Sequence, residues 1–200
     1  ERGELVAKAS DVFPQFVRFP NTLEEVAALE SIEECWFARH LLACFYYNKR
    51  SYNKAIALWQ RCVEMSPEFA DGWRGLAIHA WNKQHDYELA ARYLDNAYQL
   101  APQDARLLFE RDLLDKLSGA TPEKRLARLE NNQEIALKRD DMTAELLNLW
   151  HLTGQADKAA DILATRKFHP WEGGEGKVTS QFILNQLLRC LLYTSPSPRD

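Results

Sequence analysis

The chain has little of the residue types that mark specialised classes of protein. Its 200 residues include only eight glycines, eight prolines and four cysteines. These small numbers exclude a collagen-like chain and a Pro/Gly-rich disordered chain. No apolar run approaches the ~18 residues that a membrane-spanning helix needs. The formal net charge is −4, which is unfavourable for a protein that follows nucleic-acid phosphates. An ordinary globular composition remains.

The two ends of the sequence lack the character of natural termini. Residue 1 is Glu and no signal peptide is present, so we expect the chain to begin inside a longer reading frame. Residues 190–200 read CLLYTSPSPRD, which resembles a translated sequencing-library adapter. We expect Arg189 to be the last natural residue and 190–200 to be a non-native, disordered tail. The alternative is a natural Pro/Ser-rich tail.

Without Cys190, three cysteines remain, at positions 35, 44 and 62. An odd number without a C-x-x-C pair indicates neither a disulfide framework nor a zinc site. Each lies in an apolar stretch with helical spacing, where free cysteine acts as a small hydrophobe. We therefore expect a reducing compartment, the cytoplasm, and no metal or cofactor.

Two successive segments repeat one pattern. The first reads Leu42-Ala43-x-x-Tyr46 and then Ala55-x-x-x-Trp59, and it ends at Pro67; the second reads Trp73-x-x-Leu76-Ala77 and then Ala90-x-x-x-Leu94, and it ends at Pro102. Small residues let paired helices approach closely, and each proline ends a second helix. The pattern resembles the tetratricopeptide repeat (TPR). It predicts an all-α solenoid of helical hairpins, wound as a right-handed superhelix.

The spacing from Pro67 to Pro102 is 35 residues, one more than the TPR period of about 34. We assign the extra residue to a turn at Gln84-His85-Asp86. Two weaker repeats follow. In one, Thr121 and Pro122 begin a helix; in the other, a helix over Thr143–Leu152 precedes Ala159-x-x-x-Leu163.

The flanks complete the predicted organisation. A capping box at Thr22 begins a helix that runs to about Ile32. A last helix has its apolar face on Phe182, Ile183, Leu187 and Leu188. The predicted parts are an irregular flank (1–21), a helical repeat domain (22–167, with the best repeats at 36–69 and 70–104 and degenerate repeats at 105–139 and 140–167), a Gly-rich loop (168–177), a final helix (178–189) and the tail (190–200).

Several stretches in order resemble an uncharacterised bacterial family. The matching stretches are Val12-Phe13-Pro14, Tyr52–Pro67, Asp104–Leu108, Arg139-Asp140-Asp141 and, most specifically, RKFHPWEGGEGKV at 166–178. Members join an N-terminal galactose-mutarotase-like β-sandwich to C-terminal TPRs. The resemblance implies that a carbohydrate-related β-sandwich precedes this region in the whole protein.

The chemical motifs in the sequence are weak. Gly176-Lys177 lacks the earlier Gly and the following Ser or Thr of a phosphate loop. Glu172 and Glu175 could act as a carboxylate pair on a sugar, but a hairpin connection supplies no pocket. The five histidines have no metal-ligand spacing. RNA reading by repeats of this length needs a basic face. We therefore predict that the chain is not an enzyme and binds no nucleic acid or membrane.

The first helix of each repeat lines the concave face of a TPR array, so residues on these helices are the candidates for a partner groove. In this arrangement Tyr47 lies beside Trp81, and His40 beside Arg74 and Phe109. Aromatic residues with Arg are typical of binding hot spots. Packing of these side chains within the chain is the alternative. The groove candidates are Phe37, His40, Tyr47, Asp71, Arg74, Trp81, Arg106 and Phe109.

The Gly-rich loop contains a large apolar side chain, Trp171, in a polar setting. We interpret the loop as a docking segment for another domain; the alternatives are a surface turn and a Trp171 side chain that folds back near Trp150 or Leu163. The docking candidates are His169, Trp171, Glu172, Glu175 and Lys177.

The sequence thus predicts a non-catalytic protein-interaction scaffold with a protein or peptide partner. The alternative function is an accessory module of a carbohydrate-active β-sandwich protein, in which the missing β-sandwich is itself the partner.

Overall fold

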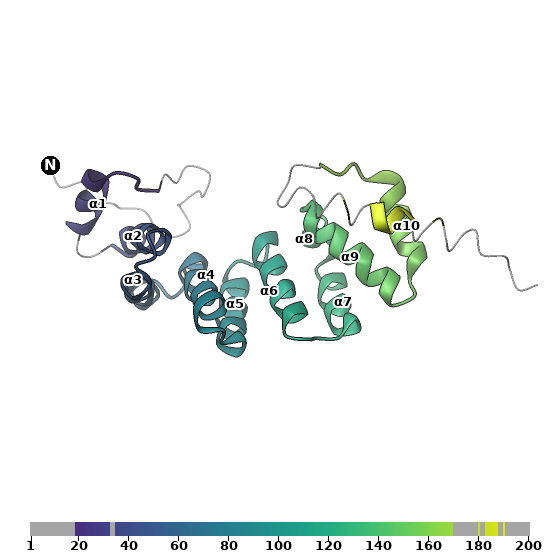
Figure 1. Cartoon of the computed structure of the whole chain (residues 1–200), viewed down its shortest axis with the longest axis horizontal. Coiled ribbons are helices and arrows are strands. Elements are labelled where there is room, and N and C mark those ends of the chain that lie inside the picture. The colour runs from purple at the N-terminus through teal and green to yellow at the C-terminus, as the bar shows by residue number, and fades with distance from the viewer. Residues whose placement is uncertain (1–18, 33–34, 170–179, 181–182, 188–189, 191–200) are drawn as a thin grey trace, which may run out of the picture. The chain divides into compact units, whose positions relative to one another are not determined.

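The computed structural model describes residues 19–32, 35–169, 180, 183–187 and 190. Within these ranges all regular secondary structure is helical (Figure 1). The helices are α1 (Leu23–Glu30), α2 (Trp36–Asn48), α3 (Tyr52–Met65), α4 (Ala70–His79), a π-helical turn η3 (Ala80–Gln84), α5 (Tyr87–Leu100), α6 (Ala105–Leu117), α7 (Pro122–Glu130), α8 (Gln133–Ala136), α9 (Asp140–Leu152) and α10 (Ala156–Thr165).

The chain divides after Pro102 into two compact units, Glu1–Pro102 and Gln103–Asp200. In the first unit α2 packs against α3, and α4 packs against α5. These are the two helical hairpins that the repeat pattern predicts. The four repeat boundaries and the other predicted domain limits remain a prediction.

The first helix, α1, begins at a capping box. The Thr22 hydroxyl accepts a hydrogen bond from the Glu25 backbone N–H, and the Glu25 carboxylate accepts one from the Thr22 backbone N–H. This reciprocal arrangement satisfies amide donors that a helix start leaves unpaired. The capping box predicted at Thr22 is confirmed, although α1 ends at Glu30 rather than near Ile32.

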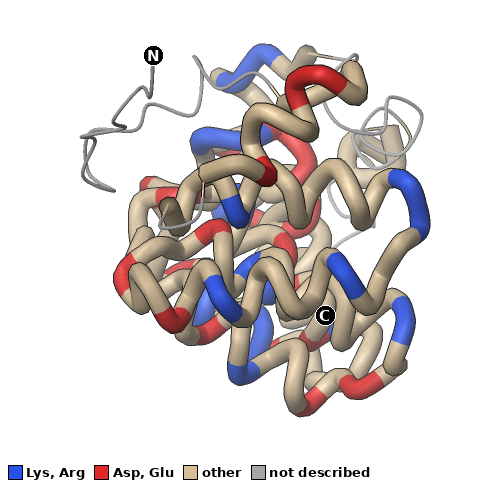
Figure 2. The backbone as a smooth tube through the Cα atoms, turned by 90° about the vertical axis from the view of Figure 1, so that its left-hand side faces the viewer, with Lys and Arg blue, Asp and Glu red and all other residues tan. Residues whose placement is uncertain are grey.

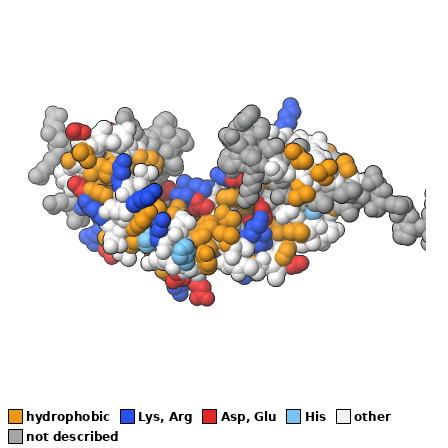
Figure 3. Space-filling model, viewed as in Figure 1, with side chains coloured by type: hydrophobic (Ala, Val, Ile, Leu, Met, Phe, Trp, Pro, Cys, Tyr) orange, Lys and Arg blue, Asp and Glu red, His pale blue; other side chains and the backbone are white. Residues whose placement is uncertain are grey.

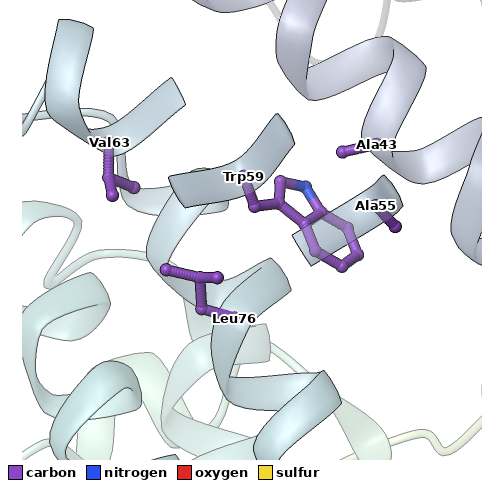
Figure 4. Packing of buried hydrophobic residues seen from close by; sticks show 5 residues of the cluster. All are labelled: Ala43, Ala55, Trp59, Val63 and Leu76. Carbon is purple, nitrogen blue, oxygen red and sulfur yellow. The ribbon is translucent and has the colours of Figure 1, made fainter. Parts of the chain in front are cut away.

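Trp59 is the centre of the core of the first unit. Its side chain is buried among Ala43, Ala55, Val63 and Leu76 (Figure 4). These residues come from α2, α3 and α4, so one indole joins three helices. The expectation that Trp59 belongs to the core is confirmed.

The extra residue of the second repeat lies inside a helix and not in the turn that follows it. Arg50 and His85 end the first helices of the two repeats with the same left-handed backbone, at φ 61° and 56°. Arg50 lies 14 residues after Trp36, the start of α2, whereas His85 lies 15 after Ala70, the start of α4. Tyr52 and Tyr87 then begin the second helices, each two residues after the left-handed residue. The π-helical turn η3 therefore takes up the additional residue, because each of its turns holds more residues than an α-turn.

The second unit contains α6 to α10. Thr121 caps α7 and Pro122 is its first residue, as predicted. The helix expected to begin at Thr143 begins at Asp140, which was missed by sequence reasoning. Asp140 and Asp141 stand in the first turn of α9, where negative charge is favoured by the helix dipole. Both acidic residues are therefore part of the helix and do not precede it.

Of the four residues expected on the apolar face of the final helix, the structure describes Ile183 and Leu187. Residues 180, 183–187 and 190 are helical. Ile183 and Leu187 are 52% and 56% exposed, whereas Asn185 is fully buried. The side of the helix that packs inward is thus the one carrying Asn185. Residues 1–18 and 191–200, with the predictions made for them, lie outside the described residues.

Candidate interaction surface

The groove candidates of the first unit lie on α2 and α4, which contact each other directly, except for Trp81, which lies on η3. Near the start of α2 the Phe37 and His40 rings stack, with centroids 6.3 Å apart. The Phe69 ring, which comes from the residue before α4, lies edge-on to His40 at 5.0 Å. The aromatic residues of this end therefore pack partly on one another.

One turn further along α2, polar groups from both helices meet. The Sγ atom of Cys44 lies 3.7 Å from Nε2 of His40. The charges of Asp71 and Arg74, both on α4, act on the Cys44 thiol. Burial raises the pKa of that thiol to about 12, and the nearby Asp71 carboxylate contributes to the rise. Cys44 is thus a neutral thiol and not a nucleophile.

Tyr47, at the end of α2, lies beside rings of α3 and α4. Its ring centroid lies 5.3 Å from that of Trp59 and 6.2 Å from that of His79. The expected neighbour was Trp81, which lies two residues further on inside η3, where it is half-buried. A π-helical turn shifts side chains from α-helical positions, and the expected Tyr47–Trp81 neighbourhood stays a prediction.

The groove candidates of the second unit are engaged within that unit. The Arg106 guanidinium pairs with the Asp104 carboxylate, with Nη2 3.0 Å from Oδ2. The Phe109 ring lies under the Arg139 guanidinium, at 5.4 Å from the ring centroid. The expected neighbourhood of His40 and Phe109 joins the two units and stays a prediction.

The Gly-rich loop starts from a fixed point on α9. The buried Asp140 carboxylate accepts a 2.6 Å hydrogen bond from the His169 backbone N–H and two hydrogen bonds from Arg166. Burial opposes ionisation of Asp140, but these donors outweigh it and lower its pKa. Arg166 also donates to the Leu137 carbonyl oxygen at 2.6 Å. The other docking candidates, Trp171, Glu172, Glu175 and Lys177, lie outside the described residues.

Sequence reasoning missed a buried cluster of charges in the second unit. Arg125, on α7, binds Asp112 of α6 through two hydrogen bonds, of 3.1 and 2.6 Å. Arg125 also donates to the Glu145 carboxylate of α9 at 2.6 Å. All three residues are buried. Three helices are therefore joined by one guanidinium.

The cluster continues on either side of Arg125. Lys116 donates to both Glu145 oxygens, at 2.8 and 3.0 Å. Asp115 pairs with Arg111 and, at 3.0 Å, with Arg128. A signal for this arrangement was present in the sequence. Arg111 lies four residues after Leu107 and three before Leu114, and Asp112 lies four after Leu108 and three before Asp115. Residues with this spacing lie on one side of a helix, so these charges share the apolar face of α6.

The pKa values of two acidic residues of the cluster, Asp112 and Glu145, are shifted in opposite directions. Burial raises the pKa of Asp112 despite its pairing with Arg125. Burial also opposes ionisation of Glu145, but hydrogen bonds from Arg125 and Lys116 outweigh it and lower its pKa. Glu145, held by two cations, is thus the more firmly ionised of the two.

Among the described residues, no group of three His, Cys, Asp or Glu side chains is placed to hold a metal ion. No helix in this part of the chain has both the length and the hydropathy needed to span a lipid bilayer. Acidic and basic positions are interspersed along the helices in the view of Figure 2.

Comparison with known proteins identifies the fold. No protein-family model matches the chain. PilF of Pseudomonas aeruginosa is similar in structure, with a TM-score of 0.58 at 15% identity over 84% of this chain and 81% of PilF. TTC0263, a thermophilic TPR protein of Thermus thermophilus, gives 0.50 at 19% identity over 80% and 86%. YrrB, a TPR protein with an unusual peptide-binding site, gives 0.53 at 17% identity over 86% and 83%.

At these identities the similarity shows the fold. The predicted all-α fold built from TPR-type helical hairpins is confirmed. The relation to a mutarotase-linked family remains a prediction that rests on the sequence resemblance.

Proposed function

We propose that the chain is a protein-interaction module in which the α2–α4 surface of the first unit binds a peptide segment of a partner. This surface is defined by the partly exposed Phe37, Cys44, Asp71 and Arg74, together with the buried His40, which contacts Cys44. The observation that carries the proposal is that two adjacent first helices bring aromatic, thiol and charged side chains together on one side. Such mixed surfaces suit peptide recognition, because aromatic contacts supply affinity and charged groups fix orientation.

The fold supports the same function. TPR-type hairpins stack their first helices on one face, and extended repeat surfaces of this kind serve as binding faces. YrrB, with which the chain shares only the fold, is described as having a peptide-binding site. For this chain, peptide binding is therefore an inference from the surface and from the fold together.

The proposal is tested by peptide selection from a random dodecapeptide library, followed by calorimetry. The Asp71→Asn/Arg74→Met double variant is expected to lower the affinity for the selected peptide about tenfold. A loss of more than ~1 kcal/mol of binding free energy is typical of hot-spot residues. The matched control is Arg61→Met/Glu64→Gln. This pair has the same spacing of acidic and basic residues on α3, where it is exposed, and its loss is expected to leave affinity unchanged.

Equal losses in the two double variants would show that the surface is not the binding site. Failure to select any peptide would overturn the proposed function altogether.

The finer expectations are part of the same proposal. The missing β-sandwich as partner, and the accessory role that goes with it, are supported by the sequence resemblance alone. Anchoring of His169 on Asp140 gives the docking loop a fixed start. A reducing compartment, the cytoplasm, is supported by the free thiols of Cys35, Cys44 and Cys62. The complete reading frame tests directly whether a β-sandwich precedes this region.

A further inference from the structure

The end of α2 and the turn η3 enclose a group of three rings. Tyr47, Tyr52 and His79 come from α2, α3 and α4, and their centroids lie 5.1 to 6.2 Å apart. The Lys83 ammonium lies over the Tyr52 ring, 4.7 Å from its centroid. Figure 3 shows basic side chains among hydrophobic ones on this unit. We call these four residues the Lys83 cluster.

The π-helical turn places the lysine in the Lys83 cluster. Lys83 and Lys49 stand at the same chain distance from the start of α4 and of α2, respectively. Lys49 lies over the Phe45 ring, 5.6 Å from its centroid. Lys83, within η3, instead lies over the ring of Tyr52, which carries a hydroxyl group. The two repeats thus present equivalent lysines in different chemical settings.

The Lys83 cluster contains a buried polar atom with no partner. His79 is 8% exposed, and its Nδ1 atom has no hydrogen-bond partner among the described residues. A buried polar group without a partner costs free energy, so such an atom needs an explanation. A bound group that satisfies the imidazole would supply one.

The local charge favours an anion. Lys83 is the charged residue that acts on both Tyr47 and His79. Burial and the Lys83 charge lower the pKa of His79, which shows that the imidazole lies in an apolar and positive setting. A cation arriving here would be repelled by Lys83. A carboxylate would pair with Lys83 and accept hydrogen bonds from hydroxyl and imidazole groups.

We propose that Lys83, Tyr47, Tyr52 and His79 form a subsite that binds one carboxylate side chain, Asp or Glu, of the partner peptide. This inference rests on the proposed function, because the subsite adjoins the α2–α4 surface through Tyr47 and His79. It adds the chemistry of the partner: an acidic residue at the end of the peptide nearest η3.

The test uses peptides selected from the dodecapeptide library and resynthesised with each Asp or Glu replaced singly by Asn or Gln. One such replacement is expected to weaken binding to the wild-type chain about fivefold, as for an exposed ion pair with one added hydrogen bond. The same replacement is expected to have no effect on binding to the Lys83→Met variant. The matched control, Lys49→Met, should respond like the wild type.

Two further measurements keep the proposal falsifiable. Tyr52→Phe keeps the ring under Lys83 and removes only the hydroxyl, and it is expected to weaken the acidic peptide about threefold, as for one lost hydrogen bond. Binding of the acidic peptide, but not of its amide analogue, should raise the His79 pKa in an NMR titration, because a carboxylate favours the protonated imidazole.

The outcomes separate the two proposals. Peptides that depend on Asp71 and Arg74 but bind Lys83→Met as tightly as wild type overturn the subsite and leave the proposed function standing. An equal effect of the amide replacement in wild type and in Lys83→Met also overturns the subsite. Absence of any bound peptide overturns both.

Discussion

Trp59 fits into the first unit because the helix opposite it has no side chain at one position. A Cβ atom added to Gly75 would lie 2.3 Å from Cε2 of Trp59. Real Cβ atoms do not approach other atoms so closely, and the indole is buried on every side. Gly75 therefore sets the distance between α3 and α4.

Gly75→Ala is expected to destabilise the chain, because the buried indole has no room to move. Overpacking of a core costs about 1–3 kcal/mol, of which the better helix propensity of Ala returns up to about 1 kcal/mol. Urea denaturation, followed by circular dichroism, measures the net loss. In a Trp59→Leu background the same substitution should cost nothing, since the clash is gone. A loss that is equal in both backgrounds would rule out the clash as its cause.

At the scale of helices, buried charges join the helices of the second unit in addition to its apolar core, which includes Leu107, Leu146 and Trp150. Arg125 holds α6 through Asp112 and α9 through Glu145. Charges are costly to bury, so a network of this kind contributes less to stability than its short distances suggest. Its removal is nevertheless damaging when only one partner is lost.

Arg125→Met is expected to destabilise the second unit by about 3–5 kcal/mol, because it leaves two carboxylates buried without their common cation. Thermal unfolding monitored by calorimetry measures the loss. The triple variant Arg125→Met/Asp112→Leu/Glu145→Leu is expected to recover most of that stability, since no buried charge remains unpaired. Lys116, which is partly exposed, can turn to water in this variant.

A small effect of Arg125→Met alone, below about 1 kcal/mol, would place the cluster among weak surface ion pairs. Failure of the triple variant to recover would show that α6, α7 and α9 need the charges for correct packing and not only for their mutual compensation.

At the scale of the whole molecule, acid should act unequally on the two units. In the second unit, hydrogen bonds from Lys158 and Trp150 lower the pKa of Glu130, and donors likewise lower those of Asp140 and Glu145. A carboxylate whose pKa is lowered by folding stabilises the protein above its unfolded pKa. This stability is lost as the pH falls through the folded pKa. Asp112, whose pKa is raised, has the opposite effect, but it is outnumbered.

Hydrogen exchange over a descending pH series measures this difference. We expect amide protection in α9 to fall ahead of protection in α3 as the pH drops below about 4, the ordinary range of carboxyl groups. The carboxylates with lowered pKa in the first unit, Glu30 and Glu68, are exposed and contribute little. In Asp140→Asn the acid sensitivity of α9 should be smaller. Earlier loss of protection in α3 would contradict the expectation.

The sequence by itself determined the fold class and many of the helix limits. Thr22 and Thr121 begin helices through hydrogen bonds that reach only three residues along the chain, so local sequence contains the whole signal. The repeat period likewise predicts that His40, Asp71 and Arg74 share one side of successive hairpins, because equal spacing places equivalent residues on the same side.

Only the tertiary structure decided which polar groups are buried and which neighbour each side chain meets. Arg125 finds its partners 13 and 20 residues away, on two other helices. Tyr47 lies beside His79, which belongs to another helix. Burial and pairing depend on groups distant in sequence, and their energies are set by packing rather than by local propensity. No local pattern could therefore specify the Lys83 cluster or the partners of Arg125, although the sequence does place Asp112 on the apolar face of α6.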